Sequence, residues 1–581
     1  MIQKKLLTLL ICLSLVLCFL LPAESLPEKT LLNLSQSHEW LNLLQVDKKG
    51  HMQIHEASFY ASGYPTTPYQ ELEELINNPE PKNIARFPAR YEFIQRHLGI
   101  GTTYEENPKL QDFLHVMENE GVSFFFVAPY MGTPMSYFGH TFLKFNRKDN
   151  PNFSYIATFV GDNEDLGFWE MIYNGLSGGM EGSYSLVPFY RMHQKYVVLE
   201  QRALIEYKLN LQPFETQKML LMLYELVGRK MDYHFVLENC TSGIISLLSH
   251  ARPSLLLAQK QRTITTPIEL AALLQRDTIV TSTTSHASTV DDLHLRYSEL
   301  VREDKQLLSK LYKDTNKQTF LSHTAVKYEL LYLLKEEYLF RFKTKGEYKE
   351  DYQEVISLPV KTTIPSPKSL HTSVTHRISY VESSVRTSEQ GTSGLVTFRP
   401  LYADPWEQSF STTAKGGLAV GKIGVSYSKE ATKLERLDFL SLSAINILGR
   451  YTTAPSWTLH SGLQRSVSTD RLLLKNTLGL GVSLGNSRMY LSLLGKVNMT
   501  VFPWDLGFSI DTTACIDYDK VDVILNLEYP IISLSQGIQY QASAQIQCTI
   551  TEQFMLFAGY AMPQEVFNLG IRYRFSLFSL F

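Results

Sequence analysis

Two side chains, far apart in the sequence, have the types needed for nucleophilic catalysis. His140 follows a glycine at the head of the apolar, strand-like run in "MSYFGHTFLKF". Cys240 lies in "ENCTSGIISLL", where the apolar residues that follow it recur with helical spacing. A neutral imidazole can take the proton of a thiol and later protonate a leaving group. We therefore treat Cys240 and His140 as a candidate catalytic dyad.

The expected positions of the two residues suit this chemistry. Exposed N–H groups at a helix N-terminus favour a thiolate, and the N–H of the cysteine can bind a developing oxyanion. A histidine on a rigid strand keeps its angle to the nucleophile, and we expect Gly139 to leave open space for a substrate. In a thiolate–imidazolium pair, the cysteine pKa falls below ~8.5 and the histidine pKa rises above ~6.5.

Structural roles for both residues stay open at this point. A histidine at a strand start is commonly a hydrogen-bonded structural residue, and a buried cysteine is commonly inert packing. The spacing of His140 and Cys240 does not show that they meet in space.

Several neighbouring residues could support the dyad. A third group is expected to hold the imidazole in its productive tautomer. The next strand offers Ser154, Tyr155 and Thr158, and the residue types do not choose among them. The other candidates lie beside the dyad in the sequence: Asn239, Ser136 and Tyr137. Ser136 and Tyr137 could line the site or could only shape the turn.

Charge and residue spacing exclude several classes of function. The formal net charge is -3, so no basic excess is available to neutralise nucleic-acid phosphates. His115, His193 and His234 occur without an HExxH motif or another paired-ligand spacing, so no metal site is predicted. We expect no cofactor and no nucleic-acid partner.

The beginning of the chain predicts export through a secretory signal peptide, residues 1–25. Lys4 and Lys5 precede an apolar run from Leu6 to Leu21, and Ala23-Glu24-Ser25 is a small-x-small cleavage site. A retained membrane anchor is the alternative.

Three cysteines follow the signal peptide: Cys240, Cys515 and Cys548. An odd number in an oxidising compartment leaves at least one of them unpaired. Cys515 and Cys548 lie in one region of similar composition and could pair. Cys240 is then the expected free thiol.

Length and composition predict a multidomain α+β protein, because 581 residues are too many for one core. The expected parts after the signal peptide are a helical domain (26–120), a domain of alternating strands and helices (121–260), a linker with a helical hairpin (261–365), and a β-rich region (366–581). Residues 261–295 are rich in Thr and Ser, which predicts a loop.

The β-rich region has the period-two pattern of an outer-membrane barrel. From Ile538 to Ile550, apolar and small residues alternate with polar ones at every step. About twelve such segments of roughly ten residues, separated by turns, are what an antiparallel transmembrane barrel needs. Phe581 ends an alternating last segment, which resembles the signal read by the barrel assembly machinery. A soluble β-sandwich, which also alternates, is the alternative.

Residues from about 110 to 260 resemble the Lnb family, named for the Bacteroides-type lipoprotein N-acyltransferase. The matching pieces are "SYFGHTFLKF", "YNGLSGGMEGSYSLVPFY", "EQRALIEYKLNL" and "YHFVLENCTSGIISLL". The order of a strand histidine and then an Asn-Cys pair at a helix is similar to circularly permuted NlpC-type, papain-like domains. "FPAR", "FRPLYADPWE" and "SWTLHSGL" resemble the larger members of this family, which carry an outer-membrane barrel.

The resemblance implies a periplasm-facing enzyme with Cys240 and His140 as catalytic residues and Asn239 beside the nucleophile. The implied reaction is acyl transfer through a cysteine thioester, from a phospholipid donor to a lipoprotein amine. The implied location is the outer membrane of a Gram-negative envelope, with the N-terminal domains in the periplasm.

Residue types alone leave three functions open. The first is a cysteine acyltransferase or a lipid acyl hydrolase. The second is a peptidoglycan cysteine peptidase or amidase, because the same dyad attacks amides as readily as esters. The third is a non-enzymatic barrel protein with a degenerate catalytic domain.

Overall fold

The computed structural model describes most of the chain after residue 27. The described residues are 28–101, 106–130, 136, 139–162, 167–235, 238–257, 266–314, 317–323, 326–346, 350, 353–354, 377–389, 391–406, 411–466, 469–501, 504–518, 520–533 and 540–575. The expected signal peptide, Tyr137 and Phe581 lie outside these residues.

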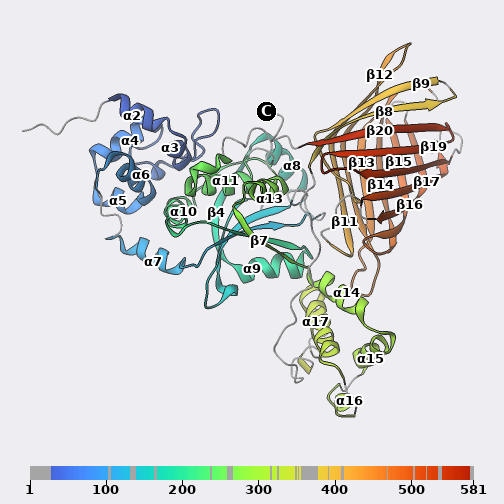
Figure 1. The fold of residues 1–581 in the computed structure, drawn as a ribbon, viewed down its shortest axis with the longest axis horizontal. Coiled ribbons are helices and arrows are strands. Elements are labelled where there is room, and N and C mark those ends of the chain that lie inside the picture. The colour runs from blue at the N-terminus through green and yellow to red at the C-terminus, as the bar shows by residue number, and fades with distance from the viewer. Residues whose placement is uncertain are drawn as a thin grey trace, which may run out of the picture.

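The chain begins with a group of short helices (Figure 1). They are α2 (Glu28–Ser35), α3 (His38–Leu43), α4 (Pro68–Asn77), α5 (Pro81–Arg86), α6 (Pro88–Leu98) and α7 (Pro108–Val116), with a 3-10 turn η1 (Ala57–Phe59). The last four α-helices each start with a proline, whose fixed φ suits a first turn. In α4, Thr67 and Gln70 also form a capping box.

A seven-stranded antiparallel sheet forms the centre of the molecule. Its strands are β1 (Val122–Val127), β2 (His140–Phe145), β3 (Tyr155–Gly161), β4 (Met180–Pro188), β5 (Leu204–Leu209), β6 (Met231–Tyr233) and β7 (Val280–His286), in the order β6-β4-β3-β2-β1-β5-β7. The strand expected to start at His140 and the next strand, which carries Tyr155 and Thr158, are therefore β2 and β3.

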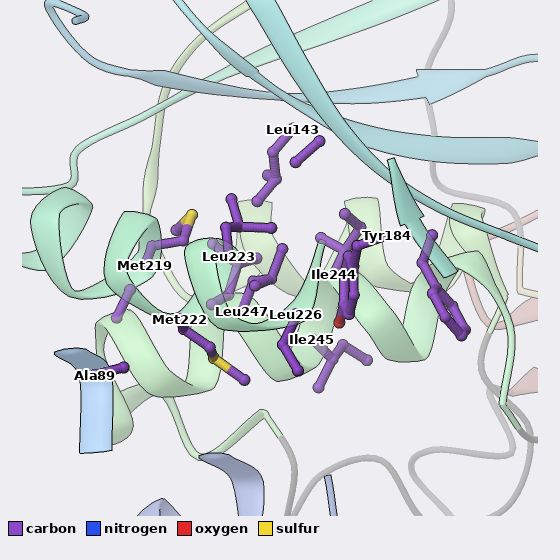
Figure 2. Packing of buried hydrophobic residues seen from close by; sticks show 14 of the residues in the cluster. Ala89, Leu143, Tyr184, Met219, Met222, Leu223, Leu226, Ile244, Ile245 and Leu247 are labelled. Atoms are coloured by element: carbon purple, nitrogen blue, oxygen red, sulfur yellow. The ribbon is translucent and has the colours of Figure 1, made fainter. Parts of the chain in front are cut away.

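Helices cover the sheet on both faces. The helical segments of this region are η4 (Pro151–Phe153), α8 (Phe168–Ser177), α9 (Phe189–His193), the π-helical turn η5 (Gln194–Leu199), α10 (Pro213–Leu226), α11 (Cys240–Ala251), η6 (Pro253–Leu255) and α13 (Pro267–Arg276). Helices α10 and α11 pack their apolar side chains under one face, where Leu223 and Ile244 lie in the same cluster as Leu143 of β2 (Figure 2). On the other face, Phe142 packs with Tyr196 of η5.

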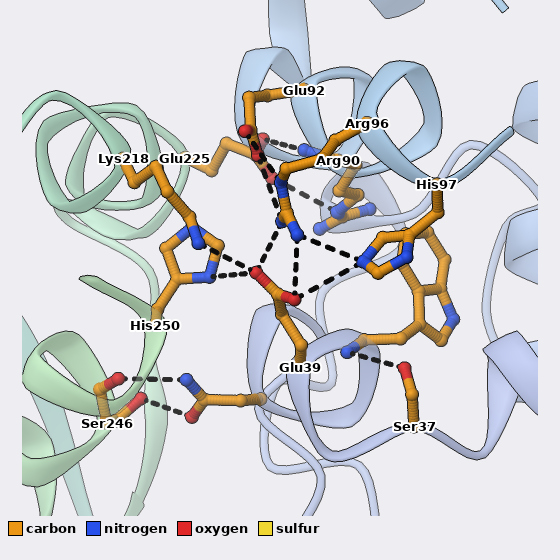
Figure 3. Close-up of polar contacts among 12 residues, drawn as sticks. Ser37, Glu39, Arg90, Glu92, Arg96, His97, Lys218, Glu225, Ser246 and His250 are labelled. Atoms are coloured by element: carbon orange, nitrogen blue, oxygen red, sulfur yellow. Dashed lines mark hydrogen bonds and ion pairs between the residues drawn. The ribbon is translucent and has the colours of Figure 1, made fainter. Parts of the chain in front are cut away.

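The N-terminal helices share the core of the sheet domain. Trp40 of α3 and Phe93 of α6 belong to the same buried cluster as Leu223 and Ile244. A half-buried carboxylate reinforces this packing, because Glu39 of α3 contacts residues of three other helices (Figure 3). Its partners are Arg96 of α6 at 2.5 Å, Lys218 of α10 at 2.9 Å and His250 of α11 at 3.9 Å.

Replacing Glu39 with glutamine should destabilise this packing in a pH-dependent way. Burial raises the pKa of Glu39, but Arg96 and Lys218 outweigh burial and lower the pKa to about 2. The folded pKa lies below the unfolded value, so the stabilisation is complete above about pH 4.5 and is lost as the pH falls towards 2. At pH 7 the loss should be at most about 3 kcal/mol. Urea unfolding of wild type and Glu39→Gln at pH 7 and pH 3 tests this, and an unchanged difference between the two pH values would contradict it.

The expected loop over 261–295 is wrong where the structure describes it. Residues 267–276 form helix α13, and Val280–His286 form strand β7, which pairs with β5 at the edge of the sheet. The Thr- and Ser-rich composition reflects an edge strand that is largely exposed to water. Threonine has a high β-propensity, so a polar β-branched run fits such an edge. The sheet domain therefore extends past the expected boundary at residue 260.

Within the described residues, the expected helical hairpin is a group of four helices. They are α14 (Thr289–Glu299), α15 (Arg302–Lys313), α16 (Lys317–His323) and α17 (Tyr328–Lys345). They enclose their own core, which contains Leu293, Leu308 and Leu334 and also Tyr451 from a turn of the C-terminal region. This shared core fixes the four helices to that region.

The C-terminal strands close into a barrel. They are β8 (Ser379–Ser388), β9 (Gly391–Arg399), β10 (Leu401–Ala403), β11 (Ala414–Tyr427), β12 (Thr432–Asn446), β13 (Ser456–Arg465), β14 (Leu472–Gly485), β15 (Met489–Val501), β16 (Asp505–Tyr518), β17 (Val521–Ser533), β18 (Gln541–Thr549), β19 (Phe554–Met562) and β20 (Val566–Phe575). From β10 to β20 each strand pairs with the next, β20 pairs with β8, β8 pairs with β9, and β9 pairs with β11. The short β10 continues β9, so the ring has twelve strands, as expected.

The outer face of the barrel is apolar, as a lipid-facing surface must be. On β14, Leu478, Leu480 and Leu484 are more than half exposed, whereas Ser483 between them faces inward and is buried. Within the described residues, no helix is both long and apolar enough to cross a membrane.

The pairing that the sequence allowed between Cys515 and Cys548 is wrong, because both are free cysteines. They lie on β16 and β18, which are separated by β17. Cys515 is aligned through Ile524 of β17 with Gln545 of β18. Side chains alternate along a strand, so Cys548 points to the opposite face from Gln545 and Cys515.

Candidate active site

His140 is the first residue of β2, and the glycine before it is required by the backbone. Gly139 has a φ of 87°, a conformation that favours glycine. A Cβ atom there would lie 2.6 Å from the carbonyl oxygen of Val127 and 2.8 Å from the ring of Phe126. The expectation that Gly139 leaves space for a substrate is therefore wrong, because strand β1 occupies that space.

The imidazole of His140 is held by a threonine of the next strand. Its Nε2 lies 2.8 Å from Oγ1 of Thr158 on β3. The ring is also 5.9 Å from the ring of Tyr196. Burial, with the positive charges of Arg202 and Lys195, lowers the pKa of His140 to about 3. The imidazole is therefore neutral at physiological pH.

Cys240 is the first residue of α11, and Asn239 caps this helix. The Asn239 side-chain oxygen accepts hydrogen bonds from the N–H groups of Thr241 at 2.9 Å and Ser242 at 3.3 Å. The Ser242 hydroxyl oxygen in turn accepts a bond from the Asn239 N–H at 2.8 Å, which completes a capping box. Asn239 thus sets the start of the helix and the place of the neighbouring thiol.

The thiol of Cys240 is buried and favours its neutral form. Burial raises its pKa, and the opposing hydrogen bonds of Thr141 and Thr241 and the charge of Arg202 do not outweigh burial. The expected pKa directions, lowered for cysteine and raised for histidine, are both reversed in the structure. The resting dyad is a neutral thiol with a neutral imidazole.

The structure brings Cys240 and His140 to the same end of the sheet. Thr141, the neighbour of His140 on β2, contacts Cys240, and the charge of Arg202 acts on both groups of the dyad. Thr141 and His140 point to opposite faces of the strand, so the thiol and the imidazole lie on opposite sides of the start of β2. Among the described residues, no hydrogen bond joins the His140 imidazole to the Cys240 thiol.

Of the three candidates for the orienting group, Thr158 is the residue that contacts His140. Ser154 is at the other end of β3, where its Oγ accepts a hydrogen bond from the Arg147 N–H at 3.0 Å. Tyr155 begins β3 at that same end and pairs with Phe145. Ser154 and Tyr155 therefore do not reach the imidazole.

Ser136 shapes the turn that leads to His140. Its carbonyl oxygen accepts hydrogen bonds from the N–H groups of Tyr130 at 2.9 Å and Gly139 at 3.0 Å. Tyr137, the other candidate in this turn, lies outside the described residues.

Sequence reasoning missed two residues that adjoin the dyad, Tyr233 and Arg202. Tyr233 of β6 fits against two glycines, Gly161 and Gly182, where added Cβ atoms would lie 2.9 Å and 2.8 Å from its ring. Its hydroxyl oxygen faces the backbone N–H of Cys240. Tyr233 occurs shortly before the cysteine in "DYHFVLENC", but no spacing rule distinguishes it.

The described part of the chain contains no set of side chains that could bind a metal ion. No three or more of its His, Cys, Asp and Glu residues are grouped so that they could hold a metal ion.

The fold defines a class of protein. A closed antiparallel barrel with an apolar outer face follows a sheet domain that has a buried cysteine and a histidine at one end. This is an outer-membrane barrel protein with N-terminal domains in the periplasm. Residues 109–276 match the family described as the Lnb N-terminal periplasmic domain, as the sequence motifs indicated. Residues 373–568 match a second family, described as a domain of unknown function, DUF7840.

Solved porin structures are similar to the barrel. A KdgM porin matches with 10% identity and a TM-score of 0.23 over 34% of this chain and 99% of its own. A NanC porin matches with 6% identity and a TM-score of 0.23 over 34% and 100%. Omp33 of Acinetobacter baumannii matches with 12% identity and a TM-score of 0.20 over 34% and 99%. Curated proteins give no match.

Proposed function

We propose that the periplasmic domain is a papain-like cysteine acyltransferase or lipid acyl hydrolase that forms a thioester on Cys240. The observation that carries the proposal is the position of the thiol. Cys240 begins a capped helix beside the strand that His140 begins, in an Lnb-type domain joined to an outer-membrane barrel. Such a domain works next to a lipid surface.

The chemistry needs one proton carrier and one nucleophile. His140 takes the thiol proton as Sγ of Cys240 attacks the carbonyl carbon of a lipid ester. The carbonyl oxygen becomes an oxyanion, which the Cys240 N–H and the adjoining Tyr233 hydroxyl can stabilise as hydrogen-bond donors. When the tetrahedral intermediate collapses, the carbon–oxygen ester bond breaks and the leaving alcohol takes the proton from the imidazolium. The products are a lysolipid and an acyl-cysteine thioester.

The second half of the reaction releases the acyl chain. A lipoprotein amine that attacks the thioester gives an amide and restores the thiol, whereas water gives a free fatty acid. His140 again accepts the proton of the attacking group and returns it to the sulfur.

Thr158 supports this mechanism as a positioning residue. If its hydroxyl oxygen accepts a hydrogen bond from Nε2–H of His140, the lone pair of the imidazole is on Nδ1. That nitrogen is then the base that serves the thiol. The neutral resting state also suits the cycle, because the ion pair need form only while a substrate shields it from water.

The test is the intact mass of the full-length protein after exposure to phospholipid. Wild type should gain one acyl mass that hydroxylamine removes, and Cys240→Ala should gain none. Cys515→Ala, which removes a thiol in the barrel, should behave as wild type. An adduct that survives in Cys240→Ala would contradict the proposal. Cleavage of purified muropeptides without any acyl adduct would favour the peptidase function instead.

A further inference from the structure

A cavity of about 600 Å³ lies where the sheet domain, the four helices and the barrel meet. Its lining includes Ala128 and Arg202 from the sheet domain, Phe340 from α17, and Leu418, Ala444 and Trp457 from the barrel. We call this space the junction cavity.

The barrel side of the junction cavity includes part of the outward-facing surface, although the inward-facing Asp404 and Lys415 also line the cavity. Gly416, Ala444, Trp457 and Leu480 lie directly opposite one another on successive strands from β11 to β14. Residues in such a row point to the same face of a sheet. Leu480 is 60% exposed on the outer wall, whereas Ala444 in the same row is 5% exposed. The cavity therefore lies at the covered end of a row that begins on the lipid-facing wall.

The inner face of the barrel near the junction cavity is charged and does not suit an acyl chain. Arg399 and Asp404 form an ion pair at 2.8 Å, and Arg572 lies 3.8 Å from the same carboxylate. A chain that reaches the cavity is better accommodated along the outer wall than through the lumen.

The other end of the junction cavity presents a buried cation. Arg202 is 2% exposed, its Nε donates to the Ala128 carbonyl at 2.6 Å, and its Nη1 donates to Glu200 at 2.8 Å. Its Nη2 is buried without a hydrogen-bond partner among the described residues. A buried donor of this kind costs stability unless a ligand pairs with it. The same guanidinium lies 5.0 Å from the centroid of the Tyr196 ring, which packs beside His140, and its charge affects the pKa of both His140 and Cys240.

Two sets of contacts hold the walls of the cavity together. Asp291 of α14 accepts hydrogen bonds from the Ser411 hydroxyl at 2.8 Å and the Thr412 N–H at 2.7 Å, both on the segment that enters β11. Glu337 of α17 pairs with Arg450, in the turn between β12 and β13, at 3.0 Å. Both carboxylates are buried, so the sheet domain and the barrel are fixed against each other through the four helices.

We propose that the junction cavity binds a glycerophospholipid that enters sideways from the periplasmic leaflet. One acyl chain lies along the outer wall of β11 to β13, the phosphate pairs with Arg202, and the ester reaches Cys240. This inference rests on the proposed function, to which it adds the place where the lipid binds and the route by which it enters. At roughly 30 Å³ for each water-sized group, 600 Å³ holds about twenty such groups, which is one acyl chain with its ester. The second chain remains in the bilayer.

The route is tested by filling the cavity from the barrel wall. In Ala444→Trp the indole occupies the junction cavity, so acylation by phospholipid vesicles should fall at least about tenfold. Acylation by a short, water-soluble ester, which does not need the wall, should stay as in wild type. Ala544→Trp, on an exposed position of β18, is the matched control and should leave both reactions unchanged. Protease protection of the barrel shows whether each variant has assembled.

The outcomes separate this inference from the proposed function. If wild type is acylated by neither substrate, the proposed function fails. If wild type is acylated by both and Ala444→Trp keeps full acylation by vesicles, the lateral route is wrong and the function stands.

A phospholipid with a photoreactive acyl chain gives a second readout that does not need activity. It should label the outward residues Leu418 and Trp457, and Arg202→Gln should reduce the labelling more than Arg202→Lys does. Labelling of the inward Ser443 and Thr458, which alternate with the outward residues, would instead indicate passage through the lumen. Equal labelling by a photoreactive free fatty acid, unaffected by Arg202→Gln, would overturn the assignment of the phosphate.

Discussion

His140→Ala should slow the acylation of Cys240 by about 10²–10⁴-fold, which is the range that a positioned general base contributes. The imidazole hydrogen-bonds with Thr158 and packs beside Tyr196, so its removal leaves β2 paired with β1 and the fold intact. The measurement is the rate of acyl-adduct formation in a single turnover, followed by intact mass.

The pH profile distinguishes a neutral dyad from a resting ion pair. Because the pKa of His140 is lowered to about 3, the base form persists throughout pH 5–8. Wild-type acylation should therefore be nearly constant over this range, whereas a histidine with a pKa of ~6.5 would lose more than about tenfold by pH 5. In His140→Ala the thiol must ionise unaided. Its pKa is raised by burial, so the rate should climb about tenfold per pH unit.

Alkylation by iodoacetamide gives an independent check of the same point. A resting thiolate would react fast at pH 6, whereas the buried neutral thiol of Cys240 should react slowly there. His286→Ala is the matched control, because His286 pairs with Glu206 on the β5–β7 edge of the sheet. A His140→Ala protein with the wild-type rate and profile would remove His140 from the mechanism.

The parts of the fold that could be predicted are those where one face is buried and the pattern is strict. The barrel strands could be predicted from their period-two alternation. One face of each strand contacts lipid and the other is polar, so a shift of one residue in the strand pairing would place every side chain on the wrong face. The run "VSFFFV" could be recognised as β1, because a short and almost continuously apolar run is typical of a strand buried on both faces, as β1 is. Strand β7 could not, since its Thr and Ser residues lie at an exposed sheet edge and look like a loop.

In the candidate site, too, some features could be predicted from the sequence and others could not. The helix start at Cys240 and the strand start at His140 are local features, and local sequence is enough to find them. The pKa directions depend on burial, which comes from packing between elements far apart in the chain, so helix-terminus arguments gave the wrong sign. The choice of Thr158 depends on which end of β3 meets β2, and that is set by strand register. Arg202 lies in the matching piece "EQRALIEYKLNL", but no spacing or residue pattern singles it out, and only the fold places it near the dyad.

Arg90→Met should be the most destabilising single change in the periplasmic region, with a loss of about 3–5 kcal/mol. Arg90 of α6 is fully buried between two carboxylates, with Nη1 2.6 Å from Glu71 and Nε 3.0 Å from Glu225. The guanidinium also stacks on the rings of Phe59 and Phe87, 4.3 Å and 4.2 Å from their centroids. Methionine fills the space but leaves two buried carboxylates without their cation.

The two carboxylates also explain why Arg90→Met should lose less stability at low pH, and less when both carboxylates are replaced as well. Burial already raises the pKa of Glu225 to about 7 against the opposing charge of Arg90, so without Arg90 it should rise further. Protonation then removes the unpaired charge, so the loss of stability should be smaller at pH 5 than at pH 8.

Arg90→Met combined with Glu71→Gln and Glu225→Gln should lose less stability than Arg90→Met alone, because the amide oxygens still accept the backbone N–H bonds of Ala61 and Ala89. Pulse proteolysis of the full chain in urea, which digests the unfolded periplasmic region, measures each variant. Arg276→Ala, at an exposed arginine of α13, is the control. If Arg90→Met were no less stable than Arg276→Ala, the buried triad would not stabilise the packing that supports the site.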